Sequence, residues 1–246
     1  MYGYIEWTKE VCRPVVAERE IQRLRFRCVA ISRRKGIPQL LQRRLVSRAA
    51  GLLHREGIVR AVFPKEFPWL EVFARHHIYP ADPMVLYRVL AAELVQARLD
   101  ASGQAGRGVT VAVSAQRLTE EVRRTVTELC IRNRYVMLAA PERDDAFCRK
   151  LRREYGIPLV QTENAEQLAK AAVVVRFSPE TTYTERQDVI DLFPGGVPFK
   201  EKLCLSPELE EQLPAGCDRM QLLAALYGAG AVRLGQIRIL YDPTQK

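Results

Sequence analysis

The sequence has few of the residues and motifs on which catalytic and metal sites are usually built. It has only three histidines, and no two of its six cysteines share a C-x-x-C spacing. Zinc sites usually contain such close pairs, because neighbouring ligands must converge on one ion. No G-x-S-x-G, P-loop or H-E-x-x-H motif occurs. We therefore predict no metal site. The sequence also offers few candidate residues for nucleophilic or general-base catalysis.

The sequence also lacks a hydrophobic run long enough to cross a membrane. A membrane span needs about 18 apolar residues, whereas the candidate at 222–232 is shorter and contains Gly228 and Gly230. The opening stretch MYGYIEWTKE shows no basic segment followed by an apolar core, so no signal peptide is visible. The hydrophobic content of 48% and charged content of 27% are ordinary for a globular protein. We expect a cytoplasmic protein with no membrane partner.

Positive charge is abundant and concentrated near the N-terminus. Residues 13–60 hold thirteen Lys or Arg against three Glu, in a chain of net charge +9. The apolar residues of 17–31 follow a 4-3-4-3 spacing that predicts a helix, although 24–28 also alternates as a strand would. After Gly36 and Pro38, a second predicted helix has one apolar face and ends at Gly57; the face comprises Leu41, Leu45, Ala49 and Leu52. We expect an α-rich basic N-terminal region.

These basic residues are candidates for contact with an anionic partner, a nucleic acid or an acidic protein surface. The stretch RLVSRAAGLLHREGIVRAVF (44–63) resembles the last helix and first wing strand of winged-helix DNA-binding domains. In the alternative interpretation, the arginines are solvated or pair with acids of the C-terminal half. The candidate basic patch comprises Arg19, Arg23, Arg27, Arg33, Arg34, Lys35, Arg43, Arg44 and Arg48.

Apolar runs and amphipathic segments alternate regularly after a small, polar linker at 100–108. We predict strands at 109–113, 135–139, 157–160 and 172–177, with helices at 118–132, 144–155 and 165–170. The strands read as continuous apolar runs, which indicates burial on both faces and a parallel sheet. Further elements are expected on either side of this alternation: strands at 58–63, 199–205 and 237–241, and helices at 70–75, 83–99, 207–213 and 220–227.

The layout from Val109 to Phe177 resembles the Rossmann-like superfold. Dinucleotide-binding members carry G-x-G-x-x-G after the first strand, so that the backbone can approach a pyrophosphate. Here that turn is Ser114-Ala115-Gln116-Arg117, so we predict no cofactor and disfavour NAD(P). Ligands of open parallel sheets bind beyond the carboxyl ends of the strands, although Ser114 and Thr119 could instead cap helices. The candidate ligand rim comprises Ser114, Gln116, Arg117, Glu142, Arg143, Gln161, Thr162, Ser178 and Thr181.

The sequence as a whole predicts an α/β protein: a three-layer Rossmann-like parallel sheet with an α-rich basic N-terminal region. The expected domains are 1–100 and 101–246, or one continuous domain from about residue 57. The function favoured is a non-catalytic binding or regulatory protein that lacks the glycine-rich cofactor loop. Two alternatives stay open: an enzyme acting on a nucleotide or anionic metabolite at the rim, and a nucleic-acid-binding protein using the basic helices. Oligomeric state does not follow from the sequence.

Overall fold

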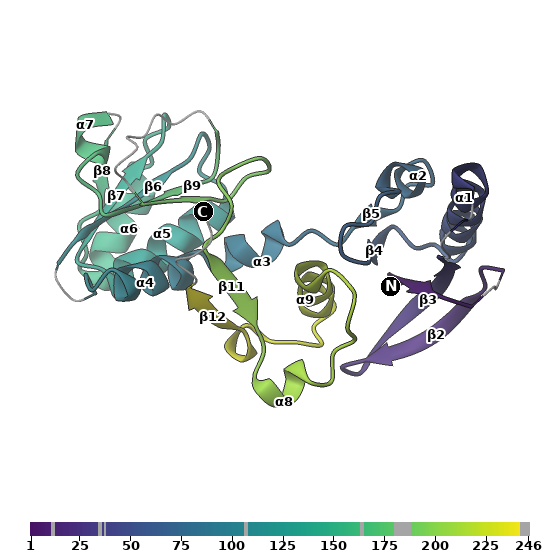
Figure 1. Cartoon of the computed structure of the whole chain (residues 1–246). Helices are drawn as coiled ribbons and strands as arrows, with labels where there is room; N and C mark the ends of the chain where they lie inside the picture. Colours follow the sequence, from purple (N-terminus) through teal and green to yellow (C-terminus); the bar gives the residue numbers. More distant parts are fainter. Residues whose placement is uncertain are drawn as a thin grey trace. The chain divides into compact units, whose positions relative to one another are not determined.

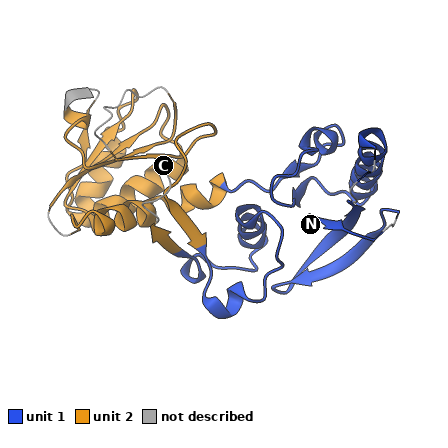
Figure 2. Cartoon of the chain, in the orientation of Figure 1, with its two compact units in different colours: residues 1–83, 204–238 blue, residues 84–203, 239–246 orange. Residues whose placement is uncertain are grey.

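The chain folds into two compact units (Figure 2). The computed structural model describes residues 1–10, 13–33, 36, 38–105, 108–162, 165–179 and 188–241. Unit 1 consists of Met1–Pro83 and Cys204–Arg238, and unit 2 of Met84–Leu203 and Ile239–Lys246. The domain division expected from the sequence, at residue 100 or near residue 57, stays a prediction.

A five-stranded sheet forms the centre of unit 1 (Figure 1). Its strand order is β2 (Val16–Ile21), β3 (Leu24–Ser32), β1 (Tyr2–Thr8), β4 (Arg60–Val62) and β5 (Tyr79–Pro80). β1 runs parallel to β3 and β4, and β4 runs parallel to β5, whereas β2 pairs antiparallel with β3. The N-terminal region is therefore built on a β-sheet, and the α-rich region expected from the sequence is wrong.

The helix predicted over 17–31 is a β-hairpin instead. β2 and β3 are joined through Gln22 and Arg23, whose φ angles are 50° and 62°. Positive φ at both central residues is the geometry of a type I′ hairpin turn, which Asn-Gly usually signals and which here carries no such signal. Phe26 and Cys28, two residues apart, are both buried. The strand interpretation is correct because burial of one sheet face follows a period of two.

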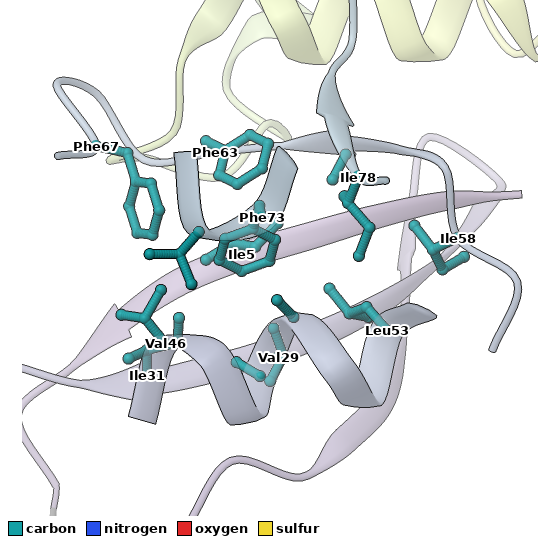
Figure 3. Packing of buried hydrophobic residues seen from close by; sticks show 14 residues of the cluster. Ile5, Val29, Ile31, Val46, Leu53, Ile58, Phe63, Phe67, Phe73 and Ile78 are labelled. Atoms are coloured by element: carbon teal, nitrogen blue, oxygen red, sulfur yellow. The ribbon is translucent and has the colours of Figure 1, made fainter. Parts of the chain in front are cut away.

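Helix α1 (Gln39–Arg55) confirms the second predicted helix, but a different face meets the core. Leu41, expected on the buried face, is 49% exposed. Val46 and Leu53 lie among the side chains around Ile5 of β1 (Figure 3). The helix is therefore rotated relative to the predicted apolar stripe, and its buried residues are Gln42, Val46, Ala49, Ala50 and Leu53.

The strand that follows α1 is not a wing. β4 lies within the sheet and pairs parallel with both β1 and β5, whereas a wing is an antiparallel hairpin. The resemblance of 44–63 to a winged-helix domain is therefore wrong. The predicted strand at 58–63 and the predicted short helix at 70–75 are confirmed, the latter as α2 (Leu70–Ala74).

The segment after residue 203 returns to unit 1. It contains α8 (Pro207–Glu210), α9 (Arg219–Gly228) and a 3-10 turn at Leu234–Gln236. The segment is fastened to the end of β4 by two hydrogen bonds: the Asp218 amide donates to the Phe63 carbonyl at 2.7 Å, and the Phe63 amide donates to Gln221 Oε1 at 3.0 Å. β11 (Glu201–Cys204) and β12 (Arg238–Tyr241) form a separate two-stranded sheet.

Unit 2 is built on a second five-stranded sheet, in which every strand is parallel to its neighbours. The order is β10 (Asp188–Asp191), β9 (Val173–Arg176), β6 (Thr110–Ser114), β7 (Tyr135–Ala139) and β8 (Val160–Gln161). The strands predicted at 109–113, 135–139 and 172–177 are confirmed in one parallel sheet, whereas the strand expected at 157–160 begins only at Val160, as the two-residue β8. β10 escaped prediction, because its four residues lie in a segment that reads as surface.

The helices of unit 2 follow the predicted alternation. They are α3 (Met84–Val89), α4 (Ala91–Ala101), α5 (Glu120–Arg132), α6 (Asp145–Tyr155) and α7 (Ala165–Leu168). The single helix expected over 83–99 is interrupted at Leu90, which separates α3 from α4. The first strand in sequence, β6, lies in the middle of the sheet, and the chain moves outward in one direction and then in the other. This order is the Rossmann-like one.

Candidate functional site

The predicted ligand rim lies along one edge of the unit 2 sheet. β6 and β9 are neighbours, and the chain reverses its direction of strand addition between them, so their carboxyl ends mark the switch point at which open sheets bind ligands. Ser114 is buried at the end of β6, and Ser178 is half-buried after β9. Thr181 lies outside the described residues. Gln161 ends β8, and the other rim residues follow β6, β7 or β8. Gln116, Arg117, Glu142 and Arg143 are exposed, and Gln161 and Thr162 are half-buried.

The start of α5, where a dinucleotide phosphate would be expected, is already capped and negatively charged. Thr119 caps the helix by accepting a hydrogen bond from the Val122 amide at 3.4 Å, whereas Ser114 ends a strand and caps no helix. Glu120 and Glu121 occupy the first turn. Carboxylates at this helix end repel a phosphate and already complement the helix dipole. Neither glycine nor a free helix terminus offers a phosphate cradle here.

Sequence reasoning missed a buried polar row at the switch point. Ser114, Arg176 and Asp191 are in register on β6, β9 and β10, so their side chains lie on one face of the parallel sheet. The Arg176 guanidinium makes two hydrogen bonds to the Asp191 carboxylate, at 2.6 and 2.7 Å. Arg176 also lies over the Phe193 ring, 5.3 Å from its centroid. The guanidinium and the carboxylate neutralise each other, so we interpret this ion pair as a contact that stabilises the sheet.

The turn at residues 193–198, FPGGVP, contacts the carboxylate of this ion pair. The Gly196 amide donates to the Phe193 carbonyl, and Gly195 has a φ of 82°, as the third position of a type II turn requires. The Val197 amide donates to Asp191 Oδ2 at 2.8 Å. A Cβ on Gly196 would lie 2.3 Å from the Asp191 Cβ. The glycine pair therefore serves close packing on a carboxylate and not the binding of phosphate.

A hollow of about 570 Å³ lies between α5 and α6. Arg123 donates from it to Asp144 at 2.8 Å and to Glu120 at 3.2 Å. Burial, with the nearby Glu93 carboxylate, raises the pKa of Glu128. Three basic and three acidic side chains line the hollow, so it offers an anion no net attraction; they are Arg123, Arg124, Lys150, Glu120, Glu128 and Asp144.

Four cysteines of the described chain are poor nucleophiles: Cys28, Cys130, Cys148 and Cys217. Burial raises the pKa of Cys28 and of Cys130 to about 11. Burial also raises the pKa of Cys148 and Cys217. The thiolate is the reactive form of cysteine, and at neutral pH little of it exists at these positions. Across the residues that the structure describes, no group of three or more His, Cys, Asp or Glu could hold a metal ion.

The candidate basic residues divide between two elements of unit 1. Arg19 and Arg27 lie on the β2–β3 hairpin and form ion pairs, Arg19 with Glu6 at 3.0 Å and Arg27 with Glu18 at 3.2 Å. Arg23 lies in the hairpin turn. Arg33 follows β3 and lies over the Trp7 ring at 5.3 Å, while Arg34 and Lys35 fall outside the described residues. The sequence predicted that two helices carry these cations, but the structure places them on the β2–β3 hairpin and on helix α1.

The arginines of α1 form an exposed set without acidic neighbours on their own helix. Arg43, Arg44, Arg48 and Arg55 are all exposed, and we call them the basic face. The 17 residues of α1 include no Asp or Glu. In the described part of the chain, no ion pair or hydrogen bond from these four side chains is found. The positive charges of the basic face are therefore not neutralised by any acidic side chain of α1.

Comparisons with known proteins found a likeness in fold only. No family model and no curated protein matches the chain. Solved structures that resemble it include L-tryptophan dehydrogenase from Nostoc punctiforme (14% identity, TM-score 0.29, 61% of this chain and 44% of that one). Two further structures are similarly distant. D-lactate dehydrogenase from Lactobacillus jensenii has 8% identity and a TM-score of 0.26, over 63% of this chain and 56% of that one. Shikimate 5-dehydrogenase from Listeria monocytogenes has 8% identity and a TM-score of 0.28, over 62% of this chain and 58% of that one.

These likenesses extend to an α/β fold with parallel sheets, as in Rossmann-like dehydrogenase domains, and no further. The matched part spans about half the length of each of those chains. Among the helices of the described chain, none is long and apolar enough to cross a membrane.

Proposed function

We propose that this protein is a non-catalytic binding protein that holds the phosphate backbone of a nucleic acid on the basic face of α1. The observation that carries the proposal is that Arg43, Arg44 and Arg48 are exposed on a helix with no acidic residue. Their charges are therefore available to an anion. The arginines of the hairpin differ, because Arg19 and Arg27 already have carboxylate partners.

The spacing of the basic face suits an extended polyanion. From Arg43 to Arg55, α1 rises about 18 Å at roughly 1.5 Å per residue. A DNA strand rises roughly 3.4 Å per nucleotide, so this length matches about five nucleotides. Neutralisation of several phosphates releases counterions, which is the main driving force for nonspecific binding to nucleic acid.

The features of unit 2 support a role without a cofactor. The acidic first turn of α5 disfavours binding of a pyrophosphate. Arg176 forms an ion pair with Asp191, so its charge is already neutralised. We propose that unit 2 does not bind NAD or NADP, and that it serves as a scaffold.

Salt dependence of binding tests this proposal. Fluorescence anisotropy with a labelled 20-base-pair DNA duplex would be measured over a series of KCl concentrations. The logarithm of affinity falls with the logarithm of salt by about 0.9 for each phosphate contact. The triple variant Arg43→Gln, Arg44→Gln, Arg48→Gln should flatten that slope by about two to three units.

The matched control removes the same charge from another exposed helix. Arg149, Arg152 and Arg153 of α6 are exposed, and their triple change to Gln should leave the slope within about half a unit. Equal losses in the two triple variants would mean that net charge alone attracts the duplex. Absence of binding to the unmodified chain at low salt would contradict the proposal, and would leave an acidic protein surface as the partner to test.

A further inference from the structure

The most exposed large apolar side chain of the described chain lies at the start of the basic helix. Leu40 is 75% exposed and its neighbour Leu41 is 49% exposed, and both belong to the first turn of α1. Single exposed apolar residues are common on protein surfaces. These two are adjacent, however, and they lie on the helix that carries the basic face. We call Leu40 and Leu41 the leucine tip.

The leucine tip shares a surface of α1 with the basic face. Residues three and four apart on a helix are neighbours, so Leu40 lies next to Arg43 and Arg44. Arg44 in turn lies next to Arg48, and all four side chains are exposed. The other side of α1 is buried in the core of unit 1. The outer surface of α1 therefore begins with an apolar tip and continues as a row of cations.

This combination is complementary to a partner that is anionic outside and apolar inside. The first turn of α1 contains no Asp or Glu, so no carboxylate of that turn repels an anion that approaches the leucine tip. Leu45 and Val46, one turn further along, pack against the core of unit 1, whereas Leu40 projects into solvent. A nucleic acid duplex and an anionic lipid bilayer both place negative charge outside an apolar interior.

The small extent of the exposed apolar surface favours the duplex over the bilayer. A helix that lies in a bilayer interface buries an apolar face along its length. The apolar face of α1, which includes Val46 and Leu53, is already buried in unit 1. Two leucines at one end of a helix are instead comparable with the apolar wedges, leucine among them, that some proteins insert between neighbouring base pairs.

We propose that Leu40, with Leu41 beside it, inserts between two base pairs of a duplex whose phosphates lie along the basic face. This proposal rests on the proposed function, and it specifies the partner as a duplex that unstacks readily at one step. Insertion removes the Leu40 side chain from water, while Arg43 and Arg44 contact the phosphates next to the opened step. Because unstacking costs free energy, the preferred site is a step that is already weakened, as at a mismatch.

The test compares two duplexes of equal length, one fully paired and one with a single central mismatch. Both carry 2-aminopurine, a base whose fluorescence rises when it is unstacked, beside the central position. The unmodified chain should bind the mismatched duplex about tenfold more tightly, which corresponds to roughly 1.4 kcal/mol. Binding should also raise the fluorescence of that duplex. Equal affinity for the two duplexes would overturn the proposal.

The variant Leu40→Gln removes the apolar side chain and keeps all four arginines of the basic face. It should fold like the unmodified chain, because exposed side chains contribute little to stability. It should lose the preference for the mismatch and the rise in fluorescence, while the dependence of affinity on salt stays the same. The matched control is Leu240→Gln, since Leu240 of β12 is 56% exposed, and it should retain both effects. A preference that survives in Leu40→Gln would contradict insertion of this leucine.

Lipid vesicles test the membrane alternative. Sedimentation with vesicles that contain phosphatidylserine should give the same weak binding for the unmodified chain and for Leu40→Gln, because only the arginines contact the lipid headgroups. Strong vesicle binding that Leu40→Gln abolishes, without any preference for the mismatch, would overturn the proposal in favour of a membrane surface.

The two duplexes also separate this inference from the proposed function. Absence of binding to either duplex at low salt would reject the proposed function and the insertion with it. Binding of both duplexes with equal affinity, unaffected by Leu40→Gln, would reject the insertion alone and leave the proposed function standing.

Discussion

His77 stores backbone strain that a single substitution can release. An L-residue in the left-handed region costs about 1 to 2 kcal/mol relative to the right-handed one, and His77 has a φ of 57°. Its neighbours hold the turn through backbone hydrogen bonds. The conformation of this residue is therefore set by the turn and not by the imidazole.

We expect His77→Gly to raise the free energy of unfolding by up to about 1 kcal/mol, because glycine adopts a positive φ freely. Chemical denaturation would measure the change. Glu66→Gly is the matched control, since Glu66 has a φ of 52° in a different turn. Both variants should be stabilised to a similar extent. A loss of stability in His77→Gly would show that the imidazole holds the turn.

The ion pair of Arg176 and Asp191 is a buried polar contact of the unit 2 sheet. Both residues are almost fully buried, at 5% and 2% exposure. Asp191→Ala leaves the guanidinium buried without its carboxylate, so it should lower the free energy of unfolding by about 3 to 5 kcal/mol.

The double variant Arg176→Met, Asp191→Leu is the comparison for that loss. It removes both charges at once, and it should therefore be less destabilised than Asp191→Ala. Urea unfolding followed by circular dichroism would distinguish the two. A double variant as unstable as the single one would mean that the pair contributes through packing and not through charge.

At the scale of elements, the turn 193–196 depends on a glycine for close packing. Gly196→Ala would place a methyl group 2.3 Å from the Asp191 Cβ, and we expect a loss of about 1 to 3 kcal/mol from the resulting overpacking. Gly235→Ala is the control, because nothing lies within 4 Å of that position. Thermal unfolding would measure both variants. Equal melting temperatures would show that the turn moves away from β10 at little cost.

The sequence predicted the elements whose pattern is local and missed those that depend on distant partners. Residues 135–139 are an apolar run with strong strand formers, and β7 has these bounds. The hairpin of β2 and β3 was misread because its turn is Gln22-Arg23, which resembles no common hairpin signal. β10 was missed because its burial comes from pairing with β9, which a short segment does not reveal.

The candidate sites divided in the same way. Exposure of Arg43, Arg44 and Arg48 could be expected from the sequence, since they lie between the apolar positions of α1. The proximity of the His54 and His76 rings could not be expected, because it arises only where α2 packs on α1. The partner of Arg176 was equally hidden, since β10 itself was not predicted.

At the scale of the whole molecule, unit 2 has a Rossmann-like strand order, and we propose that it binds no dinucleotide. The first turn of α5 carries Glu120 and Glu121, and the preceding loop has no glycine. We expect isothermal titration with NAD or NADP to give a dissociation constant above about 1 mM, a free energy weaker than about −4 kcal/mol. Glu120→Gln with Glu121→Gln removes the local repulsion and serves as the comparison. Micromolar binding by the unmodified chain would show that the loop after β6 accepts a phosphate without glycine.

We propose that α1 of unit 1 holds a nucleic acid, and that no ligand is held at the rim of unit 2. The most direct measurement is a map of backbone amide NMR shifts in the isotope-labelled full chain as a DNA duplex is added. We expect the largest shifts in residues 39–55 and in the turn at 75–78, with the loops at 115–117 and 141–143 unchanged. Shifts concentrated in those two loops, with α1 silent, would contradict the claim.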